Sequence, residues 1–146
     1  MYTGLLHAHS GFRWLVLIFL VVAISLSIYG WVKRNDWTKS GKITSLILMI
    51  VMDIQFLIGL ILYVFLSPMT KAAFNDFGAA MKNEALRFYA VEHSLMMLIA
   101  LALVHIGRSR TKKDIAGWKK HRTAVIFYTI SLLVILMAIP WDRALF

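Results

Sequence analysis

Hydrophobic residues in the chain are grouped into four long runs, and polar joins separate them. The runs cover approximately residues 9–32, 43–66, 87–107 and 123–141. Each run is close to the ~20 residues that a helix needs to cross a ~30 Å hydrocarbon layer. Lipid offers no partner to backbone polar groups, so helices are the expected form. The pattern predicts an all-α fold, a four-helix transmembrane bundle formed as one domain by residues 1–146.

Basic residues are unevenly distributed over the joins, which predicts how the bundle is oriented. The first and third joins, VKRNDWTKSGK and RSRTKKDIAGWKKHR, contain eleven Lys and Arg residues. The opposite side has five, which are Arg13, Lys71, Lys82, Arg87 and Arg143. Because basic joins are retained in the cytoplasm, we expect both termini and the middle join, residues 67–87, on the outer (periplasmic) side. The middle join has the pattern of either a short interfacial helix or an irregular loop.

Composition narrows the class of protein. Hydrophobic residues make up 60% of the 146 positions, and soluble domains are nearer to half apolar. The chain has no cysteine, which excludes disulfides, iron–sulfur clusters and the covalent attachment of c-type haem. The net charge is +9, but it is concentrated in the joins, so we attribute it to membrane topology and not to nucleic-acid binding.

Ionisable residues at the outer ends of the first and third runs form the main candidate site, because such residues are costly in membranes. They are His7, His9, Arg13, Arg87, Glu92 and His93. The first and third helices run in the same direction, so His9 and His93 are expected at similar depth. Two imidazoles from different helices can ligate one haem iron. The alternative is structural, with His93 hydrogen-bonded to another helix and His9 at the membrane interface.

A second histidine pair at the inner side, His105 with His121, is a weaker candidate. His93 and His105 are twelve residues apart, which places them about 120° apart around an ideal helix. His121 is flanked by Lys120 and Arg122, so we expect it to be a solvated loop residue.

Asp53 and Gln55 are polar residues about ten positions into the second run, roughly 15 Å deep. No basic residue is expected at that depth, so Asp53 should be protonated or hydrogen-bonded across the bundle. The candidate partners are Ser25, Ser27, Thr129 and Ser131. Asp53 then either relays protons or lines a quinone site, or it is an interhelical staple. Glu92 projects about 100° from His93 on a helix, so it is expected to serve another helix's histidine or a substrate proton.

The stretches HSGFRWLVL, DIQFLIGLILY, RFYAVEHSLMMLIA and IPW are similar to a family of small bacterial four-helix inner-membrane proteins labelled cytochrome b or cytochrome b-like. The resemblance covers nearly the whole chain, and the third stretch is its most specific part. It implies an integral membrane protein with b-type haem. The polar set that it points to is His9, Arg13, Asp53, Gln55, Arg87, Glu92 and His93. His105 and His121 are outside these stretches, which argues against two haems.

The leading hypothesis is a b-type cytochrome of the bacterial inner membrane that passes electrons between membrane quinol and a partner. In this hypothesis His9 and His93 bind the haem iron, and His7 is the alternative on the first helix. Arg13 and Arg87 would hold the haem carboxylates. The residues expected to handle protons or a quinone head group are Asp53, Gln55 and Glu92.

Two other hypotheses assign no redox function to the chain. In one, the outer cluster binds a metal ion, a lipid or a partner subunit, with His7, His9, Glu92 and His93 as possible metal donors. In the other, the chain is an accessory subunit of a larger membrane complex. The expected partners are the lipid bilayer, with a quinone, other membrane subunits or further copies of the chain as candidates, and no nucleic acid.

Overall fold

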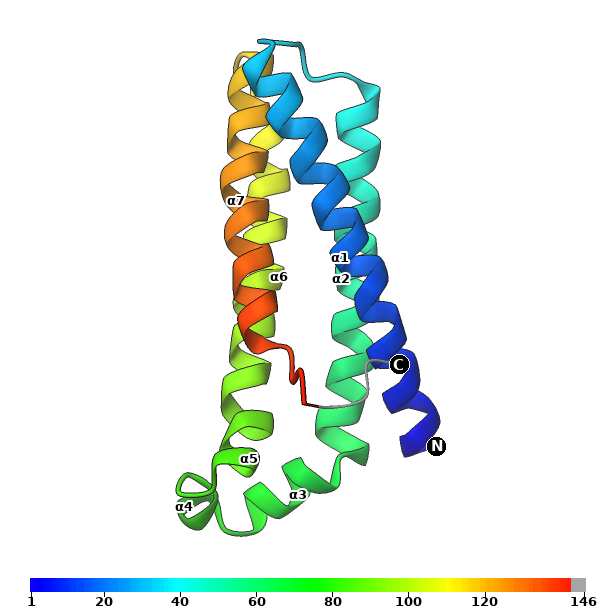
Figure 1. Ribbon diagram of the computed structural model, residues 1–146, viewed down its shortest axis with the longest axis vertical. Helices are drawn as coiled ribbons and strands as arrows, with labels where there is room; N and C mark the ends of the chain where they lie inside the picture. The colour runs from blue at the N-terminus through cyan, green and yellow to red at the C-terminus, as the bar shows by residue number, and fades with distance from the viewer. Residues whose placement is uncertain (143–146) are drawn as a thin grey trace.

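Nine helical segments account for most of residues 1–142, the part of the chain that this computed structural model describes. Four of them are long: α1 (Tyr2–Val32), α2 (Lys39–Ile61), α6 (His93–Thr111) and α7 (Gly117–Ala138). They run side by side along the long axis of the molecule (Figure 1). The described range contains no strand, so the all-α prediction is confirmed. Arg143, which entered the charge count, lies outside the described residues.

Two of the long helices are extended by π-helical turns. α2 continues into η1 (Leu62–Leu66), and α6 is preceded by α5 (Glu84–Arg87) and η2 (Phe88–Glu92). With these extensions, four helices are long and apolar enough to cross a membrane: Tyr2–Val32, Lys39–Leu66, Glu84–Thr111 and Gly117–Ala138. The first begins earlier than the sequence pattern predicts, because no proline interrupts the chain before residue 9.

The long helices form a bundle in which each packs against two neighbours. α1 contacts α2 and α7, and α6 contacts α7 and α2, so α1 and α6 are diagonal to each other. The joins 33–38 and 112–116 lie at the same end of the bundle, and we call it the basic end. The start of α1 lies at the opposite end with α3 (Pro68–Asn75), α4 (Phe77–Ala80) and α5, and we call it the helical-loop end (Figure 1). α1 is inclined across the bundle, so it lies against α7 near the basic end and against α2 near the helical-loop end (Figure 1).

The middle join forms three short helices, which confirms the helical part of the first of the two expectations for it. Each of its short helices begins at a side-chain cap, which satisfies a backbone N–H that has no helical partner. Ser67, Asp76 and Asn83 accept from the third residue after them, at 3.3, 3.1 and 3.1 Å. Pro68 is the first residue of α3, where its missing N–H costs nothing.

The bundle core contains buried hydroxyl groups, and they are paired across helices. The Tyr128 hydroxyl on α7 donates to the Ser45 hydroxyl on α2 at 2.9 Å. Ser131 on α7 donates to the carbonyl oxygen of Ala100 on α6 at 3.0 Å. Leu20 and Val104 are fully buried around them. These bonds fix the axial register of α7 against two helices.

Tyr128→Phe is expected to lower the free energy of unfolding by about 1 kcal/mol, because Ser45 then loses its partner inside the bundle. Unfolding by sodium dodecyl sulfate in detergent micelles, followed by circular dichroism, measures the change. Tyr29→Phe is the matched control, since Tyr29 is 61% exposed and should leave stability unchanged. Equal losses in both variants would show that the buried hydroxyl pair contributes nothing.

Candidate functional site

A cavity of about 560 Å³ lies between the long helices at the helical-loop end. Most of its lining is apolar, and Ile139 and Pro140, which follow α7, form part of the wall. Polar side chains also line it, among them His9, Arg13, Gln55, Tyr63 and His93. A largely apolar cavity of this size with a few convergent polar groups is the usual form of a small-molecule or cofactor site.

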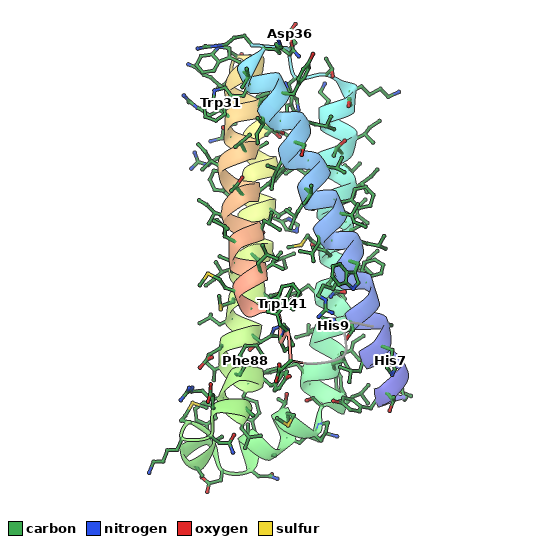
Figure 2. All side chains as sticks on the ribbon, viewed as in Figure 1. His7, His9, Trp31, Asp36, Phe88 and Trp141 are labelled. Carbon is green, nitrogen blue, oxygen red and sulfur yellow. The ribbon has the colours of Figure 1, made fainter. Side chains whose placement is uncertain are left out.

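His9 and His93 meet at this cavity from the diagonal helices α1 and α6. Their ring centres are 6.4 Å apart and their planes are at 76° to each other. Figure 2 shows His9 on the side of α1 that faces the interior of the bundle, with His7 closer to the start of the helix. The structure therefore brings together the two histidines that the sequence pairs by depth.

The His93 ring is held by contacts from two directions. Its Nδ1 lies 2.7 Å from the carbonyl oxygen of Ala138, the last residue of α7. A carbonyl oxygen only accepts, so Nδ1 carries the proton in this bond and the neutral ring has its lone pair on Nε2. The Phe88 ring packs against His93 with centres 5.7 Å apart. An N–H bond to a backbone carbonyl is how metal-ligating histidines are commonly oriented.

His9 is accommodated by a glycine on the neighbouring helix. A Cβ atom at Gly59 of α2 would lie 2.9 Å from Cε1 of His9, which is too close for two carbon atoms. Gln55, one turn earlier on α2, donates from Nε2 to the backbone carbonyl of His9 at 2.9 Å. Within residues 1–142, the buried atoms His9 Nδ1 and Gln55 Oε1 have no hydrogen-bond partner. Buried polar atoms of this kind are rare in folded proteins.

Arg13 adds a cation to the same wall. It lies one turn after His9 on α1, so both side chains are on the same side of the helix. The residue is 9% exposed, and its Cζ is 5.7 Å from the ring centre of Trp14. A buried guanidinium in a membrane-spanning segment favours an anionic group nearby.

No protein-family model, curated protein or solved structure matches this chain. What the cavity binds is therefore inferred from its geometry. Two contributors to that geometry, Gly59 and Ala138, carry no chemical signal in the sequence. A glycine opposite a histidine, or a carbonyl opposite an imidazole, becomes visible only once the helices are placed.

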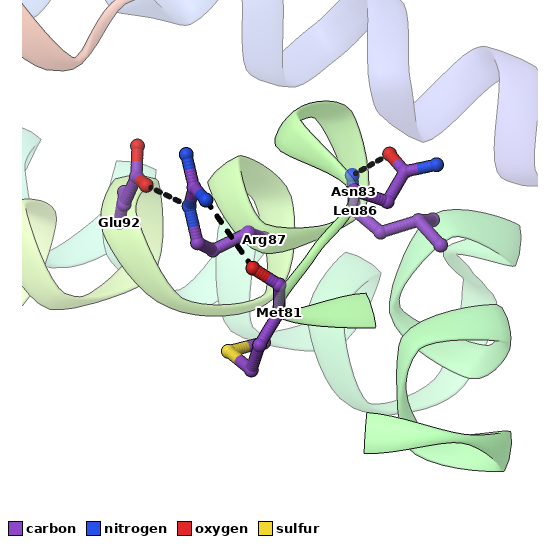
Figure 3. Close-up of polar contacts among 5 residues, drawn as sticks. All are labelled: Met81, Asn83, Leu86, Arg87 and Glu92. Atoms are coloured by element: carbon purple, nitrogen blue, oxygen red, sulfur yellow. Dashed lines mark hydrogen bonds and ion pairs between the residues drawn. The ribbon is translucent and has the colours of Figure 1, made fainter. Parts of the chain in front are cut away.

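The π turn η2 sets the arrangement of Arg87 and Glu92. Arg87 Nε donates to Glu92 Oε1 at 2.7 Å, and its Nη1 donates to the carbonyl of Met81 at 3.2 Å (Figure 3). Residues five apart on an α-helix are about 140° apart, whereas the wider π turn brings them onto one side. Glu92 is thus paired within its own helix, and the expectation that it serves a histidine of another helix is wrong.

The two π turns are joined at the cavity. The Tyr63 hydroxyl, in η1, donates to the carbonyl of Ala90, in η2, at 2.6 Å. Ser94 donates to the same carbonyl at 3.1 Å. A π turn leaves carbonyls without their usual helical partners, and these hydroxyls satisfy one of them. Such turns are frequent at functional sites.

Asp53 does not line the cavity. Its Oδ1 lies 2.6 Å from Nε2 of His105, so the pair bridges α2 and α6 on the outside of the bundle. The predicted serine and threonine partners are wrong, and Ser131 in particular donates to Ala100. His105 reaches Asp53 because α2 and α6 are staggered, which a depth estimate from each helix end does not capture.

The structure also shows the surroundings of the two remaining histidines, His121 and His7. His121 is inside α7 and only 8% exposed, so the prediction of a solvated loop residue is wrong. Its Nε2 lies 3.0 Å from the carbonyl of Asp36, and its ring lies against Gly30. His7 is exposed. Within residues 1–142, no three His, Asp or Glu side chains are grouped to hold a metal ion, so the four-donor metal site is not formed.

Proposed function

We propose that the chain is a membrane b-type cytochrome whose cavity holds one haem between His9 and His93. The observation that carries the proposal is the separation of 6.4 Å between the two ring centres. Two imidazoles that shared one metal ion, each with a metal–nitrogen bond of about 2 Å and about 1 Å from nitrogen to ring centre, would have ring centres no more than roughly 6 Å apart.

The lining of the cavity also fits the haem. Its apolar walls suit the porphyrin, and Arg13 suits a haem carboxylate. Gly59 leaves the space that His9 occupies, and the unpaired Nδ1 of His9 is a buried polar atom in need of a partner. Bound haem supplies one-electron transfer. Arg87 was also expected to hold a carboxylate, but it is engaged by Glu92 and Met81, so the proposal assigns that role to Arg13.

In this proposal the chain itself orients the ligands. The Ala138 carbonyl keeps the proton of His93 on Nδ1, which leaves Nε2 as the ligating atom. Gln55 ties the backbone of His9 to α2. Of the three residues expected to handle protons or a quinone head group, Gln55 lines the cavity, and its Oε1 can accept a hydrogen bond there. Asp53 and Glu92 have other partners.

The proposal includes a cellular setting. The excess of basic residues at the basic end supports a cytoplasmic position for that end, by the positive-inside rule. The cavity then opens near the periplasmic side of a bacterial inner membrane. Membrane quinol as donor and a partner protein as acceptor follow from the sequence resemblance to cytochrome b-like proteins, and we propose them on that ground.

A reduced-minus-oxidised absorption spectrum of the purified protein tests the proposal. We expect sharp α and β bands and a ratio of one haem per chain after expression in haem-supplemented cells. Extraction into alkaline pyridine identifies the haem type independently of the protein fold. A protein that is folded by circular dichroism but colourless after that expression would rule the proposal out.

A further inference from the structure

The Asp53–His105 pair is an ionisable contact on the outer surface of the bundle. Its atoms Oδ1 and Nε2 are 2.6 Å apart, and the two side chains remain 39% and 43% exposed. Both residues are within membrane-spanning candidates, on α2 and α6. Ionisable groups at such positions normally face the interior of a bundle or a partner, because facing lipid is costly. This pair faces outward.

The surface around the pair is otherwise apolar. Ile50 and Ile54 on α2 are 44% and 41% exposed, and Leu98 and Ile106 on α6 are 51% and 45% exposed. We call this surface, with the pair at its centre, the α2–α6 seam. Arg108 is the nearest cation in sequence on α6, and it contacts Met49 Sδ at 3.7 Å.

The pair keeps hydrogen-bonding capacity that this chain does not use. Within residues 1–142, the bond between Oδ1 and Nε2 is the one hydrogen bond that either side chain makes. Asp53 thus retains one carboxylate oxygen as acceptor, and His105 retains Nδ1. A two-fold axis along the membrane normal would place the Asp53 of one copy opposite the His105 of the other, at the same depth. The seam is therefore complementary in charge to itself.

We propose that a second copy of this chain docks on the α2–α6 seam, with two reciprocal Asp53–His105 contacts at the centre of the interface. With its imidazole protonated on both nitrogens, each His105 donates from Nε2 to its own Asp53 and from Nδ1 to the free carboxylate oxygen of the other copy, so both pairs are removed from lipid. Ala102 lies one turn before His105 and is exposed, and its small side chain allows the facing helices to approach closely. A different partner would need a matching pair of its own, whereas the second copy already has one.

Cysteine cross-linking of the purified protein in liposomes tests this interface. The chain has no native cysteine, so Ala102→Cys reports on the seam alone, and Leu133→Cys on α7, 55% exposed, is the matched control. At low protein-to-lipid ratio, oxidation should yield a disulfide-linked dimer from Ala102→Cys and monomer from Leu133→Cys. Monomer from both, or equal dimer from both, would overturn the proposal.

A second set of variants tests the polar pair itself. Adding Asp53→Leu and His105→Leu to Ala102→Cys leaves an apolar seam that still suits lipid, and should weaken dimerisation about tenfold, because two interhelical bonds are lost. Adding Asp53→His and His105→Asp should restore it, since the complementarity is kept. Unchanged cross-linking in the leucine variant would overturn the role of the pair. A cross-link to another protein in native membranes, with none in liposomes, would assign the seam to that protein instead.

Discussion

His93→Ala is expected to abolish stable haem binding while the bundle remains folded. The side chain supplies one of the two proposed ligands, and its position is fixed by Ala138 and Phe88. Loss of an outer contact to a metal ligand costs about 10- to 100-fold in affinity, so loss of the ligand itself should cost more than about 100-fold. The α band of the reduced protein should disappear, and haem should be lost during purification.

His105→Ala is the matched control for that change. It removes a histidine from the same helix, twelve residues away and outside the cavity. Its haem content and spectrum should equal those of the unmodified chain, even where dimerisation is weakened. Because the two variants separate the cavity from the seam, the haem proposal and the dimer proposal can fail independently. Equal haem loss in both variants would mean that the spectrum reports general destabilisation and not ligation.

Gly59→Ala is expected to weaken haem binding through His9. The new methyl group would lie 2.9 Å from Cε1 of His9, so the imidazole must move away from α2. Overpacking of this kind costs roughly 1–3 kcal/mol, which is about 5- to 150-fold in haem affinity if the ring can no longer reach its ligating position. Haem titration of the apoprotein measures the affinity, and the α band reports whether both imidazoles still bind.

Gly11→Ala separates the steric effect from the effect on the helix backbone. Alanine in place of glycine stabilises a helix by up to about 1 kcal/mol wherever it is placed. A Cβ at Gly11 meets nothing within 4 Å, so this variant should gain helix stability and keep its haem affinity. If Gly59→Ala behaved in the same way, the close approach of His9 to α2 would have no role in binding.

The sequence predicts the fold well because hydropathy dominates folding in lipid. Four apolar runs of membrane-spanning length leave few alternatives to four helices, and the structure has them. The π turns could not be predicted in this way. Each one contains an extra residue that changes which side of the helix its neighbours face, and the pattern of hydropathy does not show such a residue. At about 100° per residue, a regular helix places Arg87 and Glu92 about 140° apart, so helical geometry alone does not predict their ion pair.

The sequence predicts those parts of the site that depend only on how deep a residue lies along its helix. His9 and His93 are at the same end of two helices that run in the same direction, so their meeting follows from counting residues. The pairing of Asp53 with His105 depends on how far α2 is displaced along α6, which no single helix encodes. His121 has charged neighbours in the chain, but they project about 100° to either side of it on α7, so they say little about its own surroundings.

The π turn η2 makes one short segment of the chain unusually tolerant of the loss of a residue. A deletion of one residue between Phe88 and Glu92 would turn the five-residue π turn into a regular α-helical turn, which rotates the chain by nearly the same angle. His93 would then still face His9, and His105 would still face Asp53. A deletion inside α6 between His93 and His105 has no wide turn to absorb it, and would rotate His105 by about 100° relative to His93. Selection on this protein should therefore tolerate the loss of a residue from 88–92 more readily than a loss from the regular part of α6.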